Sequence, residues 1–282
     1  MYNITHLEPV DYLVIGHIAR DITKEGVRLG GTATYAALTA QALGLRVGVV
    51  TSWGAEIPLE KLQYIPIIND PAESSTTFEN TETPDGRVQV VHHIANPIAP
   101  HMIPEVWRNS PIVHLAPILQ EVEPYLVRIF PNSFIGLTPQ GWMRSWDRKG
   151  NIRSSEWPEA SFMLNRTEAA VISLEDVDGD ESRINELIVA CPVFVITEGS
   201  KGSRLYWHGD VRRFRPSTIY EGDSTGAGDI FATAFFIRLN KTRDPWESAR
   251  FATELAAISV TRDGLDGVPK PEEVEAASVE VL

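Results

Sequence analysis

Cysteine is nearly absent from this sequence, with Cys191 the only one among 282 residues. A single cysteine cannot form a disulfide within the chain, which favours a reducing compartment, so we expect a cytoplasmic protein. No apolar run reaches the ~18 residues that a membrane span needs, and residues 1–9 lack the basic and apolar regions of a signal peptide. These absences argue against a secreted domain held together by disulfides and against a membrane partner.

Basic residues are also in deficit. The sequence has 25 Lys and Arg against 38 Asp and Glu, a formal net charge of −13 at pH 7. Nucleic acids and anionic membranes are bound through basic surfaces, so we expect no partner of either kind. An acidic protein can still bind a nucleotide, provided that local hydrogen-bond donors and a metal ion offset the charge. The expected partners are therefore small molecules.

Short apolar runs alternate with helical patterns along most of the chain, which is typical of βαβ units around a parallel sheet. The predicted strands are 12–16, 46–51, 112–115, 134–137, 162–164 and 193–197, with an antiparallel edge hairpin at 203–208 and 211–215. The predicted helices are 32–43, 120–129, 181–190, 226–240 and 245–261. We predict an α/β fold, with a mostly parallel central sheet flanked by helices, in a single domain over 1–282.

Two segments interrupt this alternation. The β-prone runs within 75–94 are joined by Pro84-Asp-Gly86, a strong hairpin signal. Residues 22–29 are just long enough for a minimal hairpin around Glu25-Gly26. Because neither hairpin fits a parallel sheet, both together predict a small β flap inserted in the domain.

The stretch Gly222-Asp-Ser-Thr-Gly-Ala-Gly-Asp229 carries the most chemical information. It runs into an apolar helical segment, 230–239, and a glycine-rich turn at a helix N-terminus presents unpaired N–H groups that attract an anion. The amides expected to hold that anion are those of Gly226, Ala227 and Gly228. Asp229 would repel a phosphate there, so it fits better as a base that deprotonates a hydroxyl attacking the phosphate. The stretch therefore indicates phosphoryl transfer to an alcohol.

Other motifs lie near predicted ligand positions. Asn165-Arg-Thr-Glu168 follows the predicted strand 162–164, and Thr197-Glu-Gly-Ser-Lys-Gly202 follows the predicted strand 193–197. Open α/β sheets bind ligands at such carboxyl ends. Together with Gly30-Gly31 and the glycine-rich stretch, these motifs resemble the ribokinase-like (PfkB) family of carbohydrate kinases over nearly the whole chain. The resemblance implies a ribokinase-like fold that uses ATP with Mg²⁺.

The resemblance also implies roles for individual residues on the donor side. Asp229 matches the family's catalytic base, and the three amides before it match the anion hole. Asn165 and Glu168 match an Asn-x-x-Glu motif that helps to organise Mg²⁺ and the phosphates, often through water. The other nucleotide-binding residues that it implies are Thr197, Gly199, Gly202 and Thr225, with Thr261 and Gly264 in the stretch that borders the adenine.

On the acceptor side, Asp21 matches the family carboxylate that grips substrate hydroxyls, and Gly30 and Gly31 match glycines beside the sugar. Ala19 and Tyr35 stand where ribokinase-type members carry asparagines that hydrogen-bond the sugar. The loss of two amide partners disfavours ribose itself and makes Tyr35 a candidate substrate contact. The short run between Asp21 and Gly30 implies a reduced flap.

Three further segments are similar to the inositol-kinase branch of the family: Gly16-His17 with Asp21, Pro139-Gln-Gly-Trp142, and Thr197-Glu-Gly199 with Tyr206-Trp207. The leading hypothesis is an ATP- and Mg²⁺-dependent kinase that phosphorylates a hydroxyl of a sugar or an inositol-like polyol. One alternative is a nucleoside kinase, favoured if Tyr35 or Phe78 stacks on a base. Another is a non-catalytic protein that senses sugars or nucleotides on the same fold. K⁺ is a further candidate cofactor, and both a monomer and a homodimer stay open.

Overall fold

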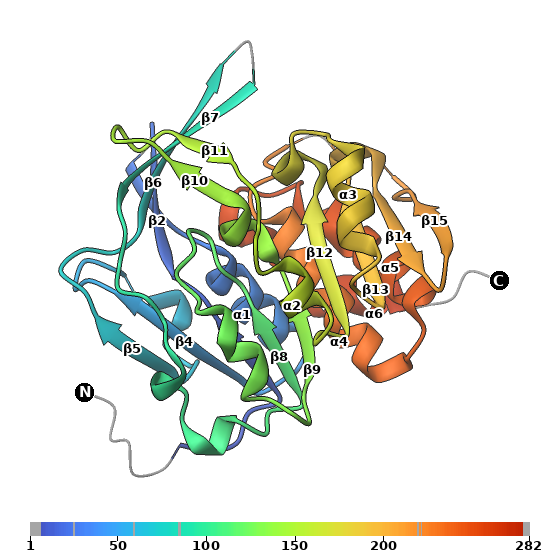
Figure 1. The fold of residues 1–282 in the computed structure, drawn as a ribbon, viewed down its shortest axis with the longest axis horizontal. Coiled ribbons are helices and arrows are strands. Elements are labelled where there is room, and N and C mark those ends of the chain that lie inside the picture. The colour runs from blue at the N-terminus through green and yellow to red at the C-terminus, as the bar shows by residue number, and fades with distance from the viewer. Residues whose placement is uncertain are drawn as a thin grey trace.

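The computed structural model describes residues 7–24, 26–58, 60–83, 86–218, 220 and 222–278. A nine-stranded sheet forms its centre, in the order β15-β14-β13-β12-β9-β8-β1-β4-β5 (Figure 1). Its strands are β1 (Tyr12–Ile15), β4 (Val47–Trp53), β5 (Ile67–Pro71), β8 (Ile112–Leu115), β9 (Phe134–Leu137), β12 (Ala169–Ser173), β13 (Val193–Thr197), β14 (Ser203–Trp207) and β15 (Asp210–Phe214). Neighbours from β5 to β13 pair in parallel, whereas β14 and β15 add an antiparallel edge. The predicted α/β fold class is confirmed.

Helices cover both faces of this sheet. On one face lie α1 (Thr32–Ala42), α4 (Ala227–Thr242), α5 (Pro245–Ser259) and α6 (Pro271–Ser278). On the other face lie α2 (Ala160–Leu164) and α3 (Glu181–Ile188). Strand β1 shows why, because its four residues are all buried and alternate between the two hydrophobic clusters. Only a sheet covered on both faces accommodates such a strand.

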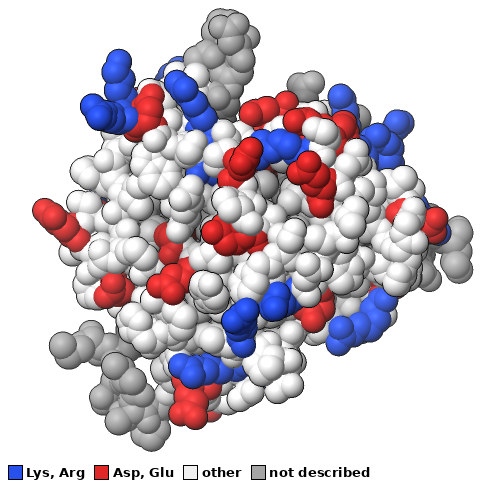
Figure 2. All heavy atoms as spheres, viewed as in Figure 1, with Lys and Arg blue, Asp and Glu red and all other residues white. Residues whose placement is uncertain are grey.

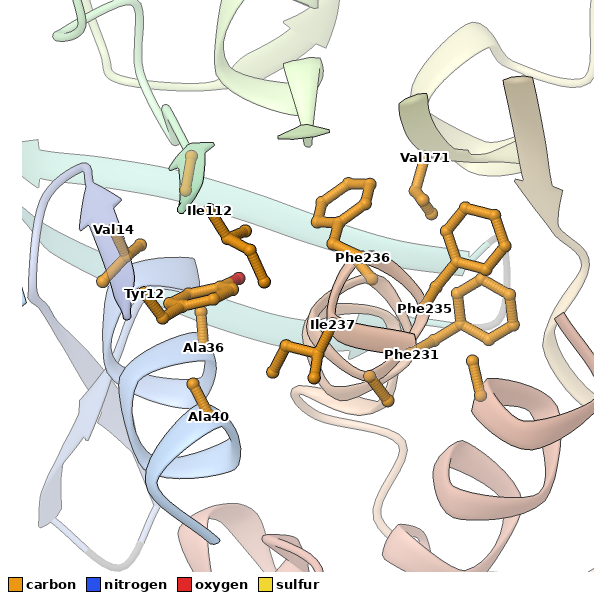
Figure 3. Close-up of a cluster of buried hydrophobic side chains, with 14 of the residues drawn as sticks. Tyr12, Val14, Ala36, Ala40, Ile112, Val171, Phe231, Phe235, Phe236 and Ile237 are labelled. Atoms are coloured by element: carbon orange, nitrogen blue, oxygen red, sulfur yellow. The ribbon is translucent and has the colours of Figure 1, made fainter. Parts of the chain in front are cut away.

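The cluster between β1, α1 and α4 sets the position of α4. Tyr12 points between Ala36 of α1 and Ile112 of β8, while Phe236 and Ile237 of α4 face the same space (Figure 3). The Tyr12 hydroxyl lies 2.8 Å from Nδ1 of the buried His114. Close packing of these buried side chains fixes the position of α4 relative to the sheet.

The two predicted hairpins join in one four-stranded flap, at the upper left of Figure 1. Its strands are β2 (Ala19–Thr23), β3 (Gly26–Gly30), β6 (Thr77–Thr83) and β7 (Gly86–His93), in the order β3-β2-β6-β7. The turn residues Glu25 and Pro84-Asp85 lie outside the described residues. A further hairpin, β10 (Arg144–Trp146) with β11 (Ile152–Ser154), lies against β7. The division into one domain with an inserted flap stays a prediction.

Some predicted elements were wrong. Residues 162–164 belong to α2, and the strand is β12, further along the chain. A three-residue apolar run fits a buried helix turn as well as a strand, so periodicity alone could not decide. Within the predicted helix 120–129, the structure forms only a 3₁₀ helix, Pro124–Arg128. Strands β5, β10 and β11 were not predicted from the sequence.

On the face shown in Figure 2, basic side chains stand singly or in small groups among acidic ones. Among the described helices, none has the length and apolar character needed to cross a membrane.

Candidate active site

A cavity of about 610 Å³ opens at the carboxyl edge of the parallel strands. Ser173 and Thr197, the last residues of β12 and β13, lie in its wall. The flap and the starts of α1 and α4 contribute further wall residues, and α5 closes the far end. The predicted site residues that line it are Asp21, Gly31, Tyr35, Thr197, Gly199, Gly202, Thr225, Gly226, Ala227, Gly228 and Asp229. The fold thus gathers most of the sequence motifs around one space.

The glycine-rich turn has the geometry of a helix entry. Gly226 is the N-cap of α4 with φ of 79°, and a Cβ at this position would overlap the Tyr35 ring. Glycine is required there for both reasons. Asp223 braces the turn, accepting from the Thr225 N–H and the Gly264 N–H at 2.9 Å each. Of the three predicted amides, that of Ala227 donates to Ser224 O at 3.1 Å and is engaged within the turn.

Asp229 lies in the first turn of α4, half-buried in the cavity wall. Burial raises its pKa from 3.8 to about 6. A hydrogen bond from Thr32 and the charge of Arg144 oppose that rise, whereas the charges of Asp176 and Asp21 add to it. A carboxylate with a pKa near 6 is mostly ionised at neutral pH and is still basic enough to accept a proton.

The end of the cavity that the sequence predicted to hold the acceptor, here called the acceptor end, combines one carboxylate with aromatic rings. Asp21 packs so closely over Gly30 that a Cβ on this glycine would overlap the carboxylate. The Asn80 side-chain amide donates to Asp21 Oδ1 at 3.5 Å. Tyr35 and Phe78 are 3% and 4% exposed and both line the cavity. This end can therefore contact hydroxyl groups and an apolar face of a ligand.

The end predicted to hold the phosphoryl donor, here called the donor end, is bounded by the turn after β13 and by the end of α5. Small and apolar residues form much of its wall, namely Gly199, Gly202, Pro216, Ala256, Ala257 and Val260. Thr261 comes directly after this wall, and its hydroxyl donates to Ile258 O at 2.8 Å. Gly264 lies beyond the wall and takes part through its hydrogen bond to Asp223.

Asn165 and Glu168 lie at the amino ends of the parallel strands, opposite the cavity, which corrects the predicted position of this motif. Glu168 precedes β12, and its carboxylate accepts from the Ile135 N–H at 2.5 Å. Ser173, at the cavity end of β12, lies five residues after Glu168, roughly 16 Å along a strand. Asn165 ends α2, and its side chain donates to Ser161 O at 2.6 Å. The prediction failed because it placed the strand before the motif instead of after it.

Another acidic group occupies the cavity edge where the motif was expected. Ser173 begins a capping box in which Asp176 Oδ2 accepts from the Ser173 N–H at 2.8 Å. Gln140 donates to Asp176 Oδ1 at 3.1 Å. Burial raises the pKa of Asp176, and Glu175 lies in the cavity wall. The run Ala169-Ala-Val-Ile-Ser173 followed by two acids was the sequence signal for this group, whereas nothing in the sequence singled out Arg144.

Comparisons with known proteins find similar kinases. Residues 157–272 match the model described as pfkB family carbohydrate kinase. A cytidine kinase of Thermococcus kodakarensis is 28% identical over 275 residues, which span 88% of this chain and 95% of the relative. An inositol 3-kinase of Oryza sativa subsp. japonica is 23% identical over 93% of this chain and 71% of the relative.

A solved structure of a pyrophosphate-dependent kinase in the ribokinase family, complexed with a pyrophosphate analog and myo-inositol, has the same fold. It is 16% identical, has a TM-score of 0.80 and covers 94% of this chain and 99% of its own. The parallel sheet, the cavity at its carboxyl edge and the matched family model lead to one conclusion. The chain has a ribokinase-like fold, and its residues 157–272 are similar to the pfkB family of carbohydrate kinases.

Proposed function

We propose that this protein transfers the γ-phosphoryl group of ATP to a hydroxyl of a small sugar or inositol-like polyol. The observation that carries the proposal is Asp229, which faces the cavity at the start of α4 with a pKa of about 6, directly after the glycine-rich turn. Asp229 takes the proton of the acceptor hydroxyl as its oxygen attacks the γ-phosphorus. The bond from that phosphorus to the bridging oxygen breaks, and ADP leaves.

Neighbouring residues divide the remaining tasks. Asp21 holds acceptor hydroxyls, because its carboxylate lines the same cavity from the flap side. Gly226 and Gly228 present backbone N–H groups to the charge that develops on the transferring phosphoryl group. The small and apolar wall from α5, with Ala257 and Val260, suits the flat face of an adenine.

Mg²⁺ fits the donor set at the cavity edge. No group of three or more acidic or histidine side chains among the described residues could hold a metal by itself. Mg²⁺ in phosphoryl-transfer sites needs only one or two carboxylates, since phosphates and waters complete its shell. Glu175 and Asp176 are the carboxylates that would meet it, instead of Glu168. When bound, the ion neutralises charge on the phosphates.

A nucleoside is the second candidate acceptor. The cytidine kinase relative is similar over nearly its whole length, and buried Tyr35 and Phe78 line the acceptor end. Aromatic rings at this place suit a nucleobase as well as the apolar face of an inositol ring.

An ATP-consumption screen over inositols, pentoses, hexoses and nucleosides tests the proposal, with the Asp229→Asn variant as the matched control. We expect turnover with one acceptor class, lowered at least ~10²-fold by the substitution. Tight ligand binding without ATP consumption for any acceptor would instead favour the non-catalytic sensor.

A further inference from the structure

The segment Pro139–Met143, a 3₁₀ helix that follows β9, is clamped against the loop after β8. The Gly141 N–H donates to Pro117 O at 3.0 Å, and a Cβ on Gly141 would lie 2.5–2.7 Å from the Pro117–Ile118 peptide. The Trp142 indole N–H donates to Val122 O at 2.8 Å, and its ring stacks on Trp157 at 5.5 Å and 10°. So firm an anchorage fixes the residues on either side of Gly141 and Trp142.

Two of those residues face the cavity. Gln140 and the first residue of β10, Arg144, both lie in its wall. Gln140 donates to Asp176, and Arg144 Nη1 donates to Ile118 O at 3.2 Å. The hairpin that starts at Arg144 is tied to the Asp176 turn as well, because Ser154 Oγ donates to Asp176 O at 2.9 Å. Arg144 is thus held between the acceptor and donor ends of the site.

The charges of the cavity wall indicate a role for Arg144 in binding an anion. Its described lining residues include the acids Asp21, Glu175 and Asp229, but Arg144 is the one basic residue among them. The positive charge of Arg144 lowers the pKa of Asp229, and both side chains line the same cavity, so the guanidinium acts on the proposed base. A terminal phosphoryl group entering between these carboxylates is repelled by each of them. A fixed guanidinium in the same wall offsets that repulsion and matches phosphoryl oxygens with a planar set of donors.

We propose that Arg144 is a catalytic residue whose guanidinium binds the transferring phosphoryl group beside Asp229. The inference rests on the proposed function. The acceptor oxygen forms its bond to phosphorus, the bond to the bridging oxygen breaks, and the acceptor proton goes to Asp229. Throughout this step Arg144 contacts the equatorial oxygens and transfers no proton. The clamped segment that ends at Met143, directly before Arg144, has a positioning role.

The test uses the full chain with Arg144→Met and Arg144→Lys. Arg153→Met is the matched control, since Arg153 lies on the paired strand β11 with its side chain 75% exposed. We expect Arg144→Met to lower kcat by ~10²-fold or more while ADP affinity stays unchanged. Arg144→Lys keeps the charge but loses the planar fork, so a loss of at least ~10-fold is expected. Arg153→Met should match wild type.

A binding measurement separates this inference from the proposed function. The affinities of ADP and of the non-hydrolysable analogue AMP-PNP are compared with Mg²⁺ present and no acceptor. Wild type should bind AMP-PNP more tightly than ADP, and Arg144→Met should lose most of that difference. If wild type phosphorylates no acceptor, the proposed function fails while this comparison still decides the role of Arg144. Unchanged kcat in both variants, or an unchanged affinity difference, would overturn the inference.

Discussion

Replacing Asp229 by Asn should stabilise the protein at neutral and alkaline pH while removing its activity. The side chain keeps its size but can no longer ionise. Its carboxyl group has a pKa of about 6 in the folded protein against 3.8 ordinarily, chiefly because of burial. Since one pKa unit corresponds to ~1.4 kcal/mol, ionised Asp229 costs the folded state at most ~3 kcal/mol.

The sign of the pH dependence follows from the raised pKa. Below pH 3.8 the group is protonated in both the folded and the unfolded chain, so the substitution changes little. As the pH rises toward 6, the unfolded chain releases its proton first and the wild type loses stability. Above pH 6 the difference in the free energy of unfolding is constant, with Asp229→Asn the more stable protein.

Equilibrium urea unfolding across this pH range measures the difference. The matched control is Asp178→Asn, because Asp178 is exposed, has φ of 53°, and asparagine accepts that backbone conformation. The same Asp229→Asn protein should lose at least ~10² in turnover, and wild-type kcat/KM should rise with pH through about 6 to a plateau. A stability difference that does not change with pH, together with retained turnover, would refute a buried base at this position.

Two further substitutions test the site. Asp176→Asn should lower kcat/KM for ATP by ~10-fold or more, because Asp176 braces the turn that places Ser173 and Glu175 in the cavity wall and its charge acts on Asp229. Glu168→Gln, at the amino end of β12, should stay within about threefold of wild type. Steady-state kinetics with varied ATP measures both, and the reverse ranking would restore the sequence-based assignment. Asp21→Asn should raise KM for the acceptor by ~10-fold or more, since Asp21 lines only the acceptor end, and ATP affinity should stay unchanged. Calorimetric ATP titration measures that affinity, and a loss of ATP binding would contradict the placement of Asp21.

Strands with strong local signals were predicted at their observed positions. Three short apolar runs bounded by polar or turn residues are strands of the central sheet, and each pairs in parallel with at least one neighbour: Ile112–Leu115, Phe134–Leu137 and Val193–Thr197. The glycine-rich stretch was also located correctly, because a turn that needs a positive φ directly before a helix leaves glycine as a visible marker.

The Asn165–Glu168 motif shows where local signals end. Apolar runs lie on both sides of it, and either one satisfies the requirement for a buried strand. The choice was made by pairing, since Ala169–Ser173 has β9 and β13 as parallel neighbours, whereas 162–164 packs as a helix turn against the sheet. Pairing is a long-range property that a short run of sequence does not encode.

By itself, the sequence indicated the class of chemistry, through an aspartate after a glycine-rich helix entry and through the order of the motifs around it. The tertiary structure alone decided which carboxylates and which cation share the cavity with that aspartate. Asp176 and Arg144 approach Asp229 only because β12 ends beside α4 and because the 3₁₀ helix Pro139–Met143 places Arg144 in the cavity wall. The interaction energy of two charges depends on their separation in space, and for residues far apart in the sequence only the fold sets that separation.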